Sequence, residues 1–136
     1  MPRKSWPLHR GCPSVEVWLR EPLTGFTSRR VLLADTGGGA RSSPIEIIVS
    51  QADIGQFGVE KDVGQVGMGG AIRGAFSIFS VEIEIPALNL SRFVDAAGVP
   101  TTNFFPGYDG FALFRFLNAF TYGNFGNPNE FGLEVA

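Results

Sequence analysis

The chain has 136 residues, of which 44% are hydrophobic and 18% are charged. This length supports one domain and leaves little room for a second, and the hydrophobic content is sufficient for a folded core. The formal net charge of −2 gives nucleic acid and anionic membranes no general electrostatic attraction to the chain. We therefore expect one globular domain with no nucleic-acid partner and no membrane partner.

Cysteine and histidine occur once each, as Cys12 and His9. A single cysteine forms no internal disulfide, and one cysteine with one histidine falls short of the usual zinc ligands. We expect no metal and no cofactor. Residues 1–13 lack the apolar middle of a secretory signal peptide. The sequence thus predicts a cytoplasmic protein with a flexible N-terminal segment over 1–13 and a single domain over 14–136.

The pattern of hydrophobic residues predicts a mostly β fold. Eighteen glycines and nine prolines separate short apolar runs, as is typical of strands joined by tight turns. Several runs alternate between apolar and polar residues, which indicates strands with one buried face. The expected strands cover residues 15–20, 30–34, 45–49, 79–85, a short stretch around Phe93 and Val94, and 131–135.

Two segments depart from this alternation. Residues 51–75 are rich in glycine and carry little periodicity, so we expect a mobile hairpin or loop there. Residues 110–122 are mostly apolar and leave Arg115, Asn118 and Tyr122 as a polar stripe at helical spacing. This stripe predicts one short, mostly buried helix near the C-terminus.

The most informative segment is VLLADTGGGA, in which an apolar run ends at Asp35, Thr36 and Gly37. A Gly-x-Gly-Gly stretch begins at Gly67, about 30 residues later, and is followed by an alternating strand and a late apolar segment, DGFALFRFL. In this order of features the chain resembles the retropepsin-like aspartic proteases over about residues 15–117. The resemblance implies a small closed β-barrel that hydrolyses an extended peptide or protein substrate.

The resemblance also implies a homodimer. Two carboxylates a few ångström apart share one proton, so that one acts as base on a water and the other as acid. Only one Asp-[Ser/Thr]-Gly triplet occurs in the chain, so each subunit would contribute one catalytic Asp35. Thr36 would join the two active-site loops, and Gly37 would let backbone approach the substrate. The residues implied at the site are catalytic Asp35, loop residues Thr36, Gly37 and Gly38, and flap residues Val66, Gly67, Met68, Gly69 and Gly70.

Three positions depart from the pattern of the family. Gly38 stands where the family usually has Ala or Ser, and this predicts a looser turn around Asp35. Leu113 stands where the family has glycine, and this predicts a different crossing of the chain behind the active site. Arg115 occupies a position that is acidic or polar in many cellular relatives.

Alternatives to an active protease remain open at this point. The same dimer could capture an extended peptide without cutting it, or the chain could be a small β-barrel interaction domain unrelated to proteases. In the last case, residues 35–39 form a plain β-turn and residues 64–74 form a solvent-exposed loop. In retropepsin-like dimers the chain termini interleave, which implies that Phe131, Leu133 and Val135 contribute to the dimer interface.

Overall fold

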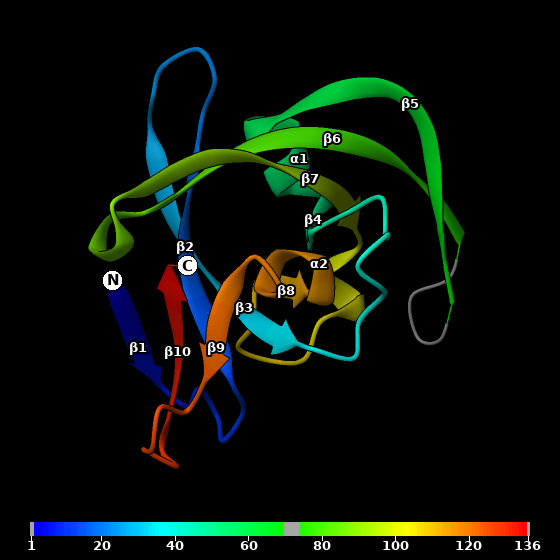
Figure 1. Ribbon diagram of the computed structural model, residues 1–136. Helices are drawn as coiled ribbons and strands as arrows, with labels where there is room; N and C mark the ends of the chain where they lie inside the picture. Colours follow the sequence, from blue (N-terminus) through cyan, green and yellow to red (C-terminus); the bar gives the residue numbers. More distant parts are fainter. Residues whose placement is uncertain (1, 70–73, 136) are drawn as a thin grey trace.

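The computed structural model describes residues 2–69 and 74–135 (Figure 1). These residues form mostly strands, with two short α-helices and two single 3₁₀ turns. The strands are β1 (Arg3–Pro7), β2 (Ser14–Arg20), β3 (Thr27–Asp35), β4 (Ile47–Ser50), β5 (Gly58–Met68), β6 (Gly74–Ile85), β7 (Leu90–Val99), β8 (Gly110–Leu113), β9 (Phe120–Gly123) and β10 (Glu130–Val135). The helices are α1 (Gln51–Phe57) and α2 (Phe114–Leu117), and the 3₁₀ turns are Pro86–Leu88 and Thr101–Asn103.

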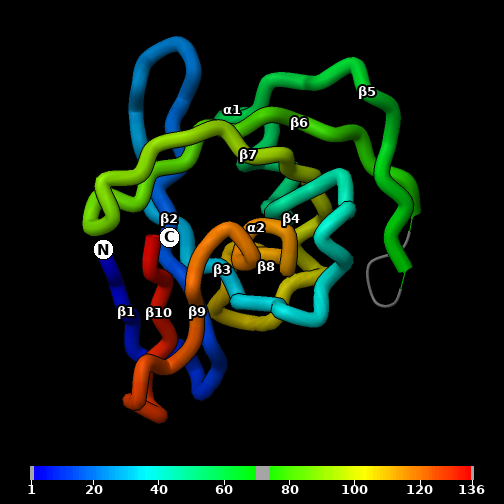
Figure 2. Tube along the Cα trace, viewed as in Figure 1, coloured from blue at the N-terminus to red at the C-terminus, as the bar shows by residue number. Residues whose placement is uncertain are grey.

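A closed barrel forms the body of the molecule. Its strands follow the order β2-β3-β8-β4-β7-β6, and pairing of β2 with β6 closes the ring. Strand β5 lies outside the ring and pairs with β6. The β5–β6 hairpin arches over one side of the barrel (Figures 1 and 2). The expectation of a mostly β protein with a small closed barrel is confirmed.

The alternating patterns correspond to strands with one face inside the barrel. In β2 the side chains of Val15, Val17 and Leu19 are fully buried, whereas Trp18 between them is partly exposed. Strand β6 behaves in the same way, since Val81 and Ile83 belong to the same buried cluster. The burial of alternate residues on each strand follows from the two-residue repeat of β structure.

The sequence pattern predicted one helix over residues 110–122, and this prediction is wrong. Gly110–Leu113 form β8, a buried strand between β3 and β4, and only Phe114–Leu117 form the helix α2. A strand with neighbours on both sides and both faces buried has a continuous apolar run, so periodicity alone did not separate it from a buried helix. A Cβ atom at Gly110 would lie 2.0 Å from the carbonyl oxygen of Ile48, so the close approach of β4 requires glycine.

The segment 51–75 contains a helix that the sequence pattern did not predict. Helix α1 begins after Ser50, whose hydroxyl accepts a hydrogen bond from the backbone N–H of Asp53. Its buried residues Ile54 and Phe57 are three apart, on one face. The rest of the described segment is the β5–β6 hairpin, as expected. Among the helices of residues 2–69 and 74–135, none is long and apolar enough to cross a membrane.

The two ends of the chain form a second sheet with the order β1-β10-β9. Trp6 of β1 is buried, and residues Arg3–Pro7 pair with β10 along their whole length. This pairing corrects the expectation of a flexible segment over 1–13. It also corrects the expectation for Phe131, Leu133 and Val135, because β10 is the central strand of its own chain's sheet and Phe131 and Leu133 pack in its own core. Both neighbours of β10 in this sheet, β1 and β9, belong to the same chain.

Because Leu133 is fully buried in the core that joins the two sheets, Leu133→Ala should lower the free energy of unfolding by about 2–5 kcal/mol. Thr121→Ala on the exposed side of β9 is the matched control and should change it by less than about 0.5 kcal/mol. Urea unfolding of the two variants and the wild type measures both values. A loss below about 1 kcal/mol for Leu133→Ala would show that β10 is detached from the core in solution.

Candidate functional site

Asp35 is the last residue of β3 and stands beside Leu113, the last residue of the parallel strand β8. The turn that follows is held by two backbone hydrogen bonds. The N–H of Gly38 donates to the carbonyl oxygen of Asp35 over 3.1 Å, and the N–H of Phe114 donates to the carbonyl oxygen of Gly38 over 3.1 Å. The start of α2 therefore fixes the turn that carries the carboxylate.

A cavity of about 450 Å³, here called the Asp35 cavity, lies against this carboxylate. Asp35 is the only ionisable side chain among the described residues that line it. Most of the remaining wall is apolar, and the described end of the β5–β6 hairpin lies on it. The lining residues are Asp35, Gly38, Gly39, Ser43, Ile45, Ile48, Val66, Gly67, Met68, Gly69, Asn103, Phe105, Phe111 and Leu113.

The structure therefore brings together most of the site residues suggested by the sequence. Asp35, Gly38 and the hairpin residues Val66–Gly69 border one cavity. Thr36 and Gly37 are exposed on the turn and do not line the cavity. Gly70 lies outside the described residues.

Gly38 is packed tightly against Asp35 and Leu113. A Cβ atom at Gly38 would lie 2.7 Å from Oδ2 of Asp35 and 2.8 Å from Cδ2 of Leu113. Such distances are too short for carbon contacts, so a larger residue would displace the carboxylate or the leucine. The turn is thus closely packed rather than loose, because the Leu113 side chain occupies the space beside the glycine.

A network of ion pairs supports the cavity wall from behind. Asp95 of β7 accepts hydrogen bonds from Lys61 of β5 at 2.6 Å and from Arg115 of α2 at 2.9 Å. Arg115 also donates to the carbonyl oxygen of Ser43, which lines the cavity. Burial alone would raise the pKa of Asp95, but the hydrogen bonds from Lys61 and Arg115 outweigh it and leave this pKa below its usual value.

Glu46 connects this network to the strands beside Asp35. Its buried carboxylate accepts hydrogen bonds from Arg92 at 2.9 Å and from the backbone N–H of Asp95 at 3.1 Å. Its carbonyl oxygen accepts from the N–H of Leu113 at 2.9 Å. The sequence drew attention to Arg115 but not to its partners. Arg115 and Asp95 are 20 residues apart and Lys61 and Asp95 are 34 residues apart, so no local sequence pattern connects them.

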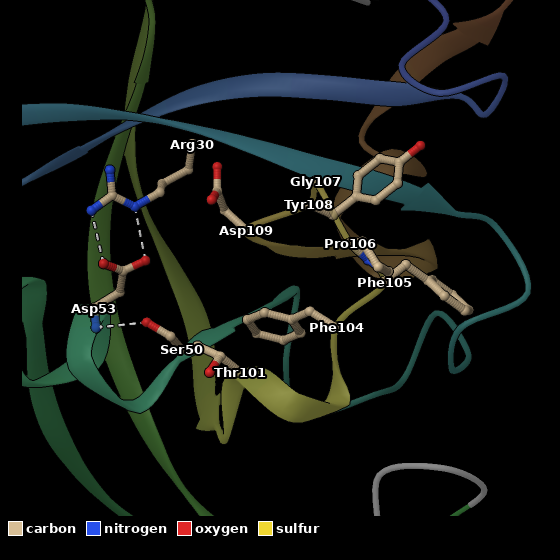
Figure 3. Close-up of a pocket in the computed structure, with 10 residues that line it drawn as sticks. All are labelled: Arg30, Ser50, Asp53, Thr101, Phe104, Phe105, Pro106, Gly107, Tyr108 and Asp109. Carbon is tan, nitrogen blue, oxygen red and sulfur yellow. Dashed lines mark hydrogen bonds and ion pairs between the residues drawn. The ribbon is translucent and has the colours of Figure 1, made fainter.

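A second cavity, also about 450 Å³, is lined mostly by the loop before β8 (Figure 3). We call it the Arg30–Asp109 cavity. Arg30 of β3 donates two hydrogen bonds of 2.9 Å to the carboxylate of Asp53 in α1. This bidentate pair raises the pKa of Arg30 above its usual value. A capping signal, Ser50 followed by Asp53, was present in the sequence, but nothing in it indicated the partner of Asp53.

Comparison of the sequence with protein-family models and with curated proteins found no match. Within residues 2–69 and 74–135, no three histidine, cysteine, aspartate or glutamate side chains lie close enough to hold a metal ion.

The contact between Gly38 and Leu113 predicts that changes at these two positions are coupled. Gly38→Ala should lower the free energy of unfolding by about 1–3 kcal/mol because the new methyl group collides with both neighbours. In the double variant Gly38→Ala/Leu113→Ala the loss should be smaller than the sum of the single losses by at least about 0.5 kcal/mol. Gly55→Ala in α1 is the control, since a Cβ there meets nothing within 4 Å. Strict additivity would contradict the contact.

The lowered pKa of Asp95 predicts a dependence of stability on pH. Its folded pKa lies below the unfolded value of 3.8, so its contribution is complete above that value and is lost as the pH falls through the folded pKa. The wild type should therefore be more stable than Asp95→Asn at about pH 6, and the difference should shrink toward about pH 2. Urea unfolding at each pH measures it. A difference that stays constant over this range would contradict the assignment.

Proposed function

We propose that this chain is an aspartic endopeptidase that works as a homodimer. The observation that carries the proposal is the placement of Asp35 at the wall of a mostly apolar cavity bordered by the β5–β6 hairpin. The sequence resemblance to retropepsin-like proteases supports the same role for Asp35. In this proposal, a water held between two Asp35 carboxyl groups attacks the peptide carbonyl, while the shared proton passes to the leaving nitrogen.

One carboxylate cannot perform both steps at once. A deprotonated carboxylate takes a proton from the water, and a protonated one donates to the substrate. The described lining of the Asp35 cavity offers a single carboxylate, so the second must come from another copy of the chain. Thr36 and Gly37 are exposed on the turn, which leaves them available for contact with the partner's turn across a twofold axis.

The shape of the site favours an extended peptide as the substrate. Strand β5 is the edge of its sheet and ends at the cavity, so its free backbone groups can pair with a peptide strand. The apolar walls formed by Ile48, Phe111 and Leu113 can accept side chains on one face of that strand. Residues Val66–Gly69 of the hairpin would then cover the bound peptide.

Cys12 bears on the location of this activity. Its thiol is exposed and forms no disulfide. Exposed free thiols persist where the surroundings are reducing, as in the cytoplasm. We therefore place the proposed enzyme in the cytoplasm, acting on a protein or peptide without a metal or cofactor.

Asp35→Asn should abolish peptide cleavage, lowering the rate by at least about a thousandfold, because the amide can neither take nor share the proton. The fold should persist, since the amide has nearly the same size. Glu16→Gln on the outside of β2 is the matched control and should cleave as the wild type does. Cleavage of a mixed peptide library, followed by mass spectrometry, measures all three. Cleavage by Asp35→Asn at the wild-type rate would refute the proposed role of Asp35.

The state of association of the same samples separates the alternatives. Sedimentation at micromolar concentration should give a dimer for both the wild type and Asp35→Asn. A strict monomer would remove the two-carboxylate mechanism. A dimer that binds library peptides but leaves them intact would favour a non-catalytic peptide-binding module.

A further inference from the structure

The Arg30–Asp109 cavity has an unbalanced charge. Arg30 and Asp53 neutralise each other, since both oxygens of Asp53 accept hydrogen bonds from the Arg30 guanidinium. The same guanidinium also donates hydrogen bonds to the hydroxyl of Ser28 and to the carbonyl oxygen of Arg29. Asp109 is the remaining ionisable group with a charge at neutral pH in the described lining. The formal charges of the side chains that line the cavity therefore sum to −1 at neutral pH, and the guanidinium of Arg10 lies outside this lining, beside Gly107.

Asp109 is held in place and still has capacity to bind. Its Oδ2 accepts a hydrogen bond of 2.8 Å from the N–H of Val31, and its own N–H donates over 2.8 Å to the carbonyl oxygen of Val31. Its Oδ1 accepts no hydrogen bond from the described part of the chain. The charge of Asp109 contributes to the raised pKa of Arg30, after the larger effect of Asp53. Asp109 is thus a fixed, exposed carboxylate with one free oxygen.

An aromatic ring forms the opposite wall. Figure 3 shows the Phe104 ring across the cavity from Asp109 and from the Arg30–Asp53 pair. Phe104 is itself held by an edge contact with Phe111, with 5.7 Å between the ring centroids. A long side chain with a cationic head can lay its alkyl stem along such a ring while the head reaches a carboxylate. A volume of about 450 Å³ leaves room for one such side chain.

We propose that the Arg30–Asp109 cavity is a recognition site for a basic side chain, lysine or arginine, of the peptide that binds in the Asp35 cavity. This inference rests on the proposed function for the identity of the peptide. The head group would lie against Asp109, and the stem would lie on Phe104. The Arg30–Asp53 pair holds the wall and, being neutral overall, does not repel the incoming cation.

The two cavities share a wall. Phe105 lines both of them, and Phe105 and Phe104 both contact Phe111, which lines the Asp35 cavity. The loop Thr101–Asp109 thus separates the cavities by about one layer of side chains. A peptide that leaves the Asp35 cavity over Phe105 would place a later side chain at Asp109.

The test uses small probes, so that it does not depend on cleavage. Nuclear magnetic resonance titration of the full chain with N-acetyl-arginine amide should shift the amide signals of Phe104, Asp109 and Val31. N-acetyl-citrulline amide has the same shape without the charge, and it should bind at least about tenfold more weakly. Equal affinity for the two probes, or shifts confined to other parts of the chain, would overturn the proposal.

Asp109→Asn is the decisive variant, because one amide oxygen still accepts the hydrogen bond from Val31 while the negative charge is lost. This variant should bind both probes with equal affinity. Glu16→Gln is the control and should keep the preference for arginine. A retained arginine preference in Asp109→Asn would refute the role of Asp109.

Cleavage then tests the connection to the Asp35 cavity. Library peptides with lysine or arginine should be cleaved preferentially by the wild type, and Asp109→Asn should lose this preference, so that the ratio of its rates on basic and neutral peptides falls to about one. If the probes bind as expected but Asp35-dependent cleavage is absent, the proposed protease function fails while the basic side-chain site stands. If cleavage occurs but shows no preference for basic peptides, the link between the two cavities is wrong.

Discussion

The parallel pairing of β3 with β8 determines where both cavities lie. Its register sets Leu32 beside Gly110 and Asp35 beside Leu113. Because β8 has only four residues, the turn that carries Asp35 lies at one end of this ladder and Asp109 lies at the other. The loop Thr101–Asp109, which leads into β8, becomes the wall between the cavities. A shift of one residue in the register of β3 against β8 would turn the Asp35 side chain to the other face of the sheet and remove the site.

The packing around Asp35 involves two of the positions at which the sequence departs from the retropepsin-like pattern that it resembles. Retropepsin-like proteases usually have a larger residue after Asp-Thr-Gly and a glycine in the late turn. Here the small residue is Gly38 and the large one is Leu113, and the two are in contact. A change in the size of one of these residues would therefore require a change in the other.

Local patterns in the sequence were sufficient for the barrel strands with one buried face and for a turn directly after Asp35, because alternation and the glycines that follow Asp35 are properties of adjacent residues. They were insufficient for β8, which is buried on both faces, and for β1, whose partner β10 lies at the other end of the chain. Local patterns also did not predict the ion pairs of Asp95 with Lys61 and Arg115. These residues meet only after three separate elements have packed together.

The pairing of β1 with β10 has a consequence for the synthesis of the protein. Arg3 lies opposite Glu134 in this sheet, so β1 has no strand to pair with in its sheet until β10 has been synthesised. Contacts between residues so far apart in sequence form slowly, since a long loop must close before they contribute energy. Trp6 must remain outside its final core until β10 has been synthesised, and during that time a chaperone that binds aromatic residues would find a target in β1.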